Sequence, residues 1–130
     1  MTLISIPALD LKPYEDDIRN TVKQALLEDI GSNFQQGDIT AQLIPLENQA
    51  KARIISRDRA IIAGSAWVNE VFKQLDPRVS IHWKVSDGQW VRPNQVLFEL
   101  TGSARSLLTG ERVALNFLQS LSGTATLCNL

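Results

Sequence analysis

The sequence contains very few of the residues that build metal and redox centres. Among its 130 residues are one cysteine, Cys128, and one histidine, His82. A single thiol forms no internal disulfide, and one cysteine with one histidine does not build a zinc site of the usual spacing. We therefore expect a chain suited to a reducing compartment, with His82 on the outer side of a strand and Cys128 as an inert thiol on a buried helix.

Long apolar segments and a large net charge are also missing. No apolar run reaches the ~20 residues of a membrane span, and the first residues lack a basic region followed by a clean apolar core, so no secretory signal is expected. The formal net charge is −1, which provides no overall positive field to attract nucleic acid. We expect a cytoplasmic protein that binds neither nucleic acid nor membranes.

The rest of the composition is that of one globular domain. Hydrophobic residues make up 44% and charged residues 21% of the chain, which is too apolar for a disordered segment. A length of 130 residues suits one domain and leaves no room for a second full one. Residues 1–14 are expected to form an extended lead-in, and residues 15–130 the domain.

The helical and extended patterns predict an α+β fold with a mainly antiparallel sheet and packed helices. Asp16 and Asp17 suit the start of a first helix, which Gly31 is expected to end. A second helix, which Ser65 is expected to cap, shows the same apolar spacing of three and four. The apolar positions are Ile18, Val22, Ala25 and Leu26 in the first helix and Val68, Val71, Phe72 and Leu75 in the second.

Strands are predicted where apolar and polar residues alternate between turn signals. After the first strand, Asp58 and Arg59 suit a turn from which the chain returns as a second, short strand. Asp76 and Pro77 end the second helix, and Asp87 with Gly88 marks another turn. The strands are expected at residues 50–57, 60–64, 79–85 and 95–100.

The last quarter, residues 103–130, predicts a long helix with an unusual polar face. Seven polar or small residues fall on one narrow stripe because their spacing alternates between four and three. The stripe carries two arginines and no carboxylate, which suits a carboxylate or phosphate ligand, or a closely approaching protein surface. Its members are Arg105, Thr109, Arg112, Asn116, Gln119, Gly123 and Thr126, opposite the apolar Leu107, Ala114, Phe117, Leu118, Leu121 and Ala125.

The end of this helix shows no stop signal. The segment after Gly123 has no basic last turn and no helix breaker, and it finishes on apolar residues. We expect the chain to be the front part of a longer protein.

Arg112 is the strongest candidate for a binding residue, because a planar guanidinium binds a carboxylate through two parallel hydrogen bonds. The pattern alone favours a plainer interpretation, a surface arginine or one paired with a carboxylate elsewhere in the fold. Arg105, near the helix start, is the weaker of the two arginines. Glu111 lies off the stripe and suits an intrahelical or subunit contact.

Three carboxylates form another candidate group: Glu28, Asp29 and Asp38. Carboxylates at such spacing can perform acid–base chemistry or bind a metal. The turn and cap signals around them favour a structural role. A different segment, residues 87–97, resembles the turn-rich strands of biotinyl and lipoyl carrier domains, but no lysine follows Lys84 to carry such a group.

Several motifs together resemble one enzyme family. ALLEDIG, GDITAQLIP, ARIISRDRAIIAG, WVNEVF, VSDGQWV, QVLFELTG and LLTGERVALNFLQSLSGTAT occur in this order from about Ala25 to Thr126. They are similar to the N-terminal part of quinolinate phosphoribosyltransferase, also called nicotinate-nucleotide pyrophosphorylase (carboxylating).

This resemblance implies an α+β N-terminal domain followed by an α/β barrel that this chain lacks. The family transfers phosphoribose from phosphoribosyl pyrophosphate (PRPP) to quinolinate, with decarboxylation, and releases nicotinate mononucleotide, CO2 and pyrophosphate for NAD synthesis. Mg²⁺ assists, with ligands on the barrel. The enzymes are homodimers or assemblies of dimers. By resemblance, Arg112 in the GER motif binds the quinolinate carboxylate across the dimer interface, and the chain alone is expected to be inactive.

Three alternatives stay open at this point. One is an enzyme like nicotinate phosphoribosyltransferase, which takes a monocarboxylate. Another is a non-catalytic binding module of the biotinyl or lipoyl type. The third is a dimerisation module whose helix stripe packs on a partner.

Overall fold

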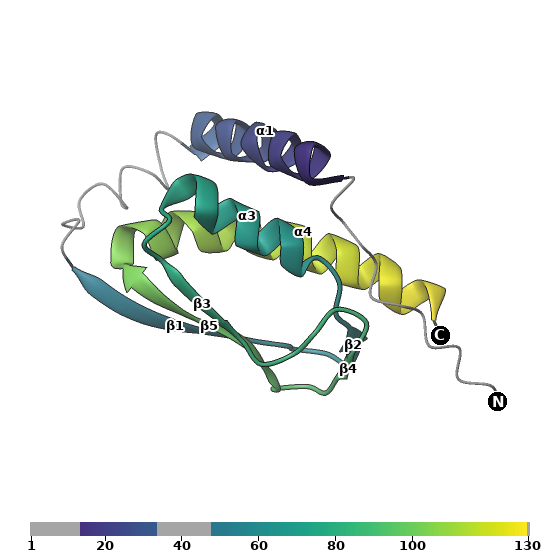
Figure 1. Ribbon diagram of the computed structural model, residues 1–130. Coiled ribbons are helices and arrows are strands. Elements are labelled where there is room, and N and C mark those ends of the chain that lie inside the picture. Colours follow the sequence, from purple (N-terminus) through teal and green to yellow (C-terminus); the bar gives the residue numbers. More distant parts are fainter. Residues whose placement is uncertain (1–13, 34–47, 130) are drawn as a thin grey trace.

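The computed structural model describes residues 14–33 and 48–129. Most of the expected lead-in and the segment around Asp38 lie outside them. The α+β class is confirmed, and none of the described helices is long and apolar enough to cross a membrane. In chain order the elements are α1 (Glu15–Asn33), β1 (Gln49–Ile55), β2 (Ala60–Ile61), α3 (Ser65–Leu75), β3 (Ser80–Trp83), β4 (Trp90–Val91), β5 (Val96–Ser103) and α4 (Ala104–Cys128) (Figure 1).

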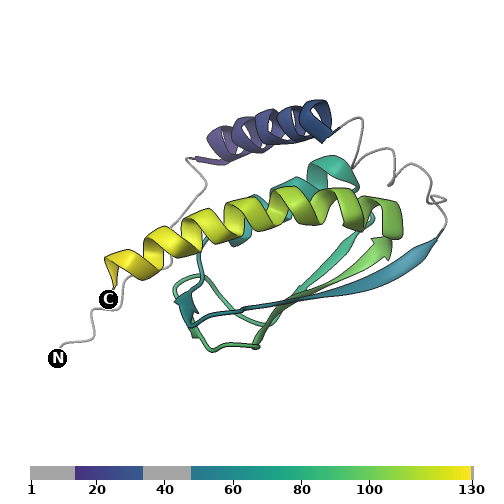
Figure 2. The ribbon, with the colours of Figure 1, turned by 180° about the vertical axis from the view of Figure 1, so that it is seen from behind.

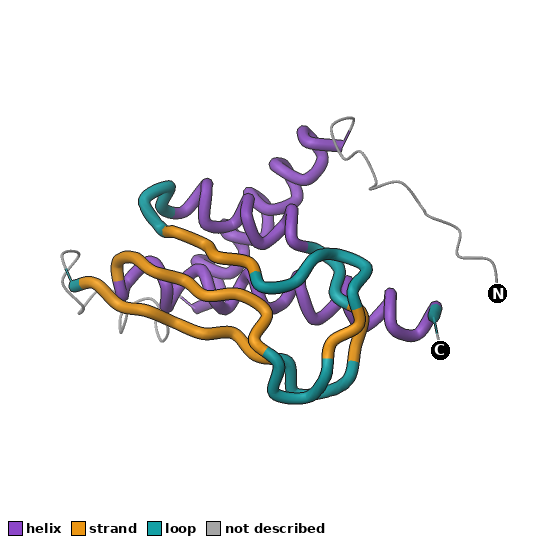
Figure 3. The backbone as a smooth tube through the Cα atoms, turned by 60° about the horizontal axis from the view of Figure 1, so that its bottom comes forward, coloured by secondary structure: helices purple, strands orange, loops and turns teal. Residues whose placement is uncertain are grey.

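The strands form two antiparallel sheets. In the larger sheet β5 lies between β1 and β3, and β2 pairs with β4 in a separate two-stranded sheet (Figure 3). The prediction that the chain returns on itself after β1 is wrong, because β2 pairs with β4 and not with β1. A register shift between Ile54 and Ile55 precedes the turn, and Ser56 then exchanges backbone hydrogen bonds with Asn94 and Gln95. These bonds direct the chain away from β1.

The helices cover one face of the sheets in two layers. Long α4 packs on β1, β2 and β5 and lies beside α3, while α1 packs on the far side of α3 and α4 (Figures 1 and 2). The predicted apolar stripes of the helices face this core: Ile18, Val22, Leu26, Val68, Val71 and Phe72 are buried. From the sheet, the rings of Phe98 and Trp83 pack against each other at an interplanar angle of 41°, with centroids 4.5 Å apart.

The contact between α3 and α4 depends on Gly110. A Cβ atom at this position would lie 3.0 Å from Cδ1 and Cζ of Phe72 and nearer still to Cε1. Glycine in a helix interior costs about 1 kcal/mol relative to alanine, and here its lack of a side chain lets the Phe72 ring pack directly on the α4 backbone. This packing explains the glycine of the TGER motif.

The start of α3 differs from the prediction. Ser65 is the first helical residue and not the cap, a position that Gly64 takes with φ 108°. The Ser65 backbone N–H and hydroxyl both donate to the Asp87 carboxylate, at 3.2 and 3.0 Å. Because a carboxylate is favourable at a helix N-terminus, Asp87 performs from a distant turn the role expected of Ser65.

Candidate functional site

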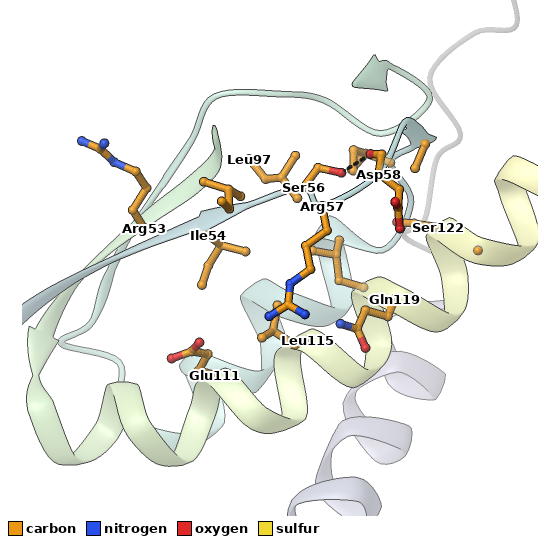
Figure 4. Close-up of a pocket in the computed structure, with 15 residues that line it drawn as sticks. Arg53, Ile54, Ser56, Arg57, Asp58, Leu97, Glu111, Leu115, Gln119 and Ser122 are labelled. Carbon is orange, nitrogen blue, oxygen red and sulfur yellow. Dashed lines mark hydrogen bonds between the residues drawn. The ribbon is translucent and has the colours of Figure 1, made fainter. Parts of the chain in front are cut away.

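The polar stripe of α4 lies between two surface hollows. One, of about 570 Å³, separates α4 from α1 and is lined partly by Asp29, Asn116 and Phe117. The other, of about 630 Å³, lies between α4 and the β1–β2 connection. In Figure 4, Arg57 extends from that connection toward Glu111 and Gln119 of α4. A further hollow, near the start of α4, is lined by Arg105 and Thr109. The stripe therefore borders several different environments and not one.

Arg112 lies at the α1 side of the stripe and binds Asp29. Its Nε donates to Asp29 Oδ1 at 2.8 Å and to Oδ2 at 3.0 Å, and its Nη2 donates to Oδ2 at 2.6 Å. The Asp29 side chain is 11% exposed, whereas that of Arg112 is 31% exposed. The arginine is thus paired with a carboxylate elsewhere in the fold, is fixed in orientation, and still reaches solvent.

The position of Asp29 on α1 explains this pairing. Asp29 follows Val22 and Leu26 at a spacing of four and three, so it continues the buried stripe of the helix. A carboxylate near a core face needs an ionic or hydrogen-bonding partner. This spacing was the signal in the sequence that could have located the pair. Its neighbour Glu28 accepts a hydrogen bond from Gln24 at 3.2 Å.

A second polar cluster, which the sequence did not predict, lies where α3 ends and α4 begins. Asp76 caps α3 and is only 6% exposed. Its carboxylate accepts hydrogen bonds from Arg78 Nε at 3.1 Å and from the Ser106 hydroxyl at 2.7 Å. These bonds, from Arg78 first and then from Ser106, hold the pKa of Asp76 below its usual range. Arg105 and Thr109 line a hollow beside this cluster.

The lowered pKa of Asp76 predicts a loss of stability in acid. Because the folded pKa lies below the unfolded value of about 4, the stabilisation is present above pH ~4 and is lost as the pH falls through the folded pKa. Asp76→Asn should flatten the dependence of the unfolding free energy on pH below this point, measured by urea denaturation from pH 5 to pH 2. The exposed Asp58→Asn is the matched control. Equal acid sensitivity of Asp76→Asn and the unchanged protein would contradict the prediction.

The remaining candidates have simple environments. His82 is exposed on β3, as predicted. The predicted burial of Cys128 is wrong, since this thiol is exposed. The last buried residue of α4 is Ser122, and the turns after it extend beyond the larger sheet (Figure 2), so Cys128 has little to pack against. Within residues 14–33 and 48–129, no three His, Cys, Asp or Glu side chains gather as metal ligands would.

The fold and the site define a class of protein. This is an α+β domain that presents an oriented, partly exposed arginine on a long helix, a form suited to binding an anionic group. Residues 38–122 match the family model described as the quinolinate phosphoribosyl transferase N-terminal domain. The chain therefore belongs to the quinolinate phosphoribosyltransferase N-terminal domain family.

Similarities to a solved structure and to curated sequences support the same family. A solved nicotinate-nucleotide pyrophosphorylase from Francisella tularensis superposes with a TM-score of 0.81 at 45% identity, over 88% of this chain and 40% of that one. A probable nicotinate-nucleotide pyrophosphorylase of Bacillus subtilis is 39% identical over 85% of this chain and 37% of its own length. A mitochondrial quinolinate phosphoribosyltransferase of Nicotiana tabacum is 35% identical over 94% and 35%. The chain spans about a third of the length of these curated relatives.

Proposed function

We propose that this chain is the N-terminal part of an enzyme that transfers phosphoribose from PRPP to the ring nitrogen of quinolinate, with decarboxylation. The products are nicotinate mononucleotide, CO2 and pyrophosphate, as required for NAD synthesis. The observation that carries the proposal is the family match over residues 38–122, which includes Arg112 in an oriented and partly exposed position.

Arg112 has the chemistry to bind quinolinate. Quinolinate is a dianion, and a guanidinium supplies both positive charge and two parallel donors to one carboxylate. The interaction strengthens where water is excluded. We propose that α4 carries Arg112 to the barrel of a second copy, so that this chain contributes substrate binding and the barrel contributes the chemistry.

An exposed apolar side chain supports an assembly of this kind. Leu108 lies one turn before Arg112 on the same face of α4 and is 41% exposed. A subunit that covers Arg112 would also cover this side chain, and the buried centre of a subunit interface is usually apolar. We propose a homodimer, or a larger assembly of dimers.

From the family resemblance we propose that Mg²⁺ assists the reaction, with its ligands on the barrel of the longer protein. Here it would neutralise the charge of the pyrophosphate group. The cytoplasmic location stays a prediction, and the Nicotiana relative is named as mitochondrial.

The longer protein tests the proposed reaction directly. Incubated with quinolinate, PRPP and Mg²⁺, it should form nicotinate mononucleotide and pyrophosphate, measured by liquid chromatography, while the 130-residue chain alone should form none. Nicotinate in place of quinolinate tests the monocarboxylate alternative, and the intact mass of the chain tests the carrier alternative. Product from nicotinate alone, or an attached cofactor, would overturn the proposal.

A further inference from the structure

The ion pair between Arg112 and Asp29 has the geometry of a support for the guanidinium. Three hydrogen bonds join two nitrogens of the arginine to both oxygens of the carboxylate. Such side-on binding fixes the plane of the guanidinium as well as its position. An arginine side chain otherwise has large rotamer freedom, and a binding arginine that must first be ordered loses affinity.

Asp29 is itself held firmly enough to serve as this support. It is more buried than the arginine that it binds, and it continues the buried stripe of α1, whose Val22 and Leu26 lie in the core. Helix α1 is also attached to α3, where the side-chain amide of Gln74 donates to the Arg19 carbonyl at 2.9 Å. The carboxylate therefore occupies a fixed place beside α4.

We infer that Asp29 is a positioning residue for substrate binding, which orients Arg112 toward the carboxylate of an aromatic dicarboxylic acid. The inference rests on the proposed function. It gives α1 a role in binding, although α1 supplies no group that touches the substrate. The alternative role of Asp29 is that its carboxylate competes with the substrate for the Arg112 guanidinium. Removing the Asp29 charge should raise the KM for quinolinate if Asp29 positions the arginine, and lower it if Asp29 competes.

Kinetics of the longer enzyme separate these roles. In Asp29→Asn one acceptor oxygen becomes an NH2 group, which cannot accept from Arg112. We expect the KM for quinolinate to rise about 5- to 30-fold, with kcat and the KM for PRPP within about 2-fold of the unchanged enzyme, as for a loss of uniform binding. Asp29→Glu keeps the carboxylate and should raise KM less. Asp17→Asn, an exposed residue of the same helix, is the control of equal charge change.

A double-mutant cycle with Arg112→Ala shows whether Asp29 acts through the arginine. If it does, adding Asp29→Asn to Arg112→Ala should leave the KM for quinolinate as in Arg112→Ala alone. Suppose that Arg112→Ala raises the KM for quinolinate, whereas Asp29→Asn leaves it unchanged or lowers it. This result would overturn the inference and leave the proposed function intact. If Arg112→Ala has no effect on KM, both the assigned role of Arg112 and the inference fail.

Discussion

Replacing Phe72 by alanine is expected to lower the free energy of unfolding by about 3–5 kcal/mol. Phe72 is 2% exposed, and its ring fills the contact between α3 and the backbone of α4 at Gly110. Removing the ring leaves a cavity between α3 and α4, because Gly110 has no side chain that could fill it. Since domains are stable by only about 5–15 kcal/mol, this change removes a large share of the total, measured by urea denaturation.

Two further variants show whether the effect comes from this contact. Leu127→Ala removes an apolar side chain that is 74% exposed and should change stability by no more than about 0.5 kcal/mol. Gly110→Ala should be destabilising beside Phe72 and better tolerated with Phe72→Leu, because the smaller side chain leaves room for the added methyl group. If Phe72→Ala lowers the free energy of unfolding by less than about 1 kcal/mol, the α3–α4 contact is not tightly packed.

Arg112→Ala is expected to raise the KM for quinolinate in the longer enzyme by about 10- to 150-fold, which corresponds to roughly 1.5–3 kcal/mol for a charge-assisted hydrogen-bonded pair. The value of kcat should change little, because the arginine holds the substrate in both the ground and the transition state. Steady-state kinetics with quinolinate varied at saturating PRPP measure both parameters.

The main control for this variant concerns folding. Truncation of Arg112 leaves Asp29, which is 11% exposed, without this arginine, so the melting temperature must be measured beside the kinetics. Arg112→Lys keeps the charge, loses the planar fork, and should give an intermediate KM. Arg92→Ala removes an exposed arginine from the β4–β5 turn and should leave KM unchanged. Normal kinetics in Arg112→Ala would remove Arg112 from the site.

Local patterns in the sequence predicted much of the fold. The apolar stripes of α1 and α3 and the long helix α4 follow from residue spacing, because each depends on neighbours within two turns. The pairing of β1 with β5 did not follow, since Gln49 and Ser103 are partners only through the folded chain. A turn at Asp58 was expected to return the chain onto β1, and backbone bonds from Ser56 to a distant turn prevented it.

The candidate site was also predicted only in part, because the partners of its residues lie far away in the sequence. Arg112 was selected from its place on the helix stripe and from the family resemblance, but its partner Asp29 lies 83 positions away in the sequence. Asp87 and Asp76 likewise bind groups on other elements. In all three cases a carboxylate was assigned to local turns and caps, because the sequence shows only local partners. The error at Cys128 has a related origin, since helical spacing does not show where the sheet beneath a helix ends.

The order of the strands has a consequence for how this domain is made. The middle strand of the larger sheet, β5, is the last of the described strands to be synthesised, and both of its neighbours come earlier in the chain. Neither β1 nor β3 has its partner until Val96–Ser103 has left the ribosome. Pairing β1 with β5 closes the loop between these two strands, which costs entropy before the strand contacts form. We therefore expect β1 to stay unpaired on the nascent chain until β5 emerges, and refolding to take on the order of milliseconds or longer, which is slower than the formation of the helices.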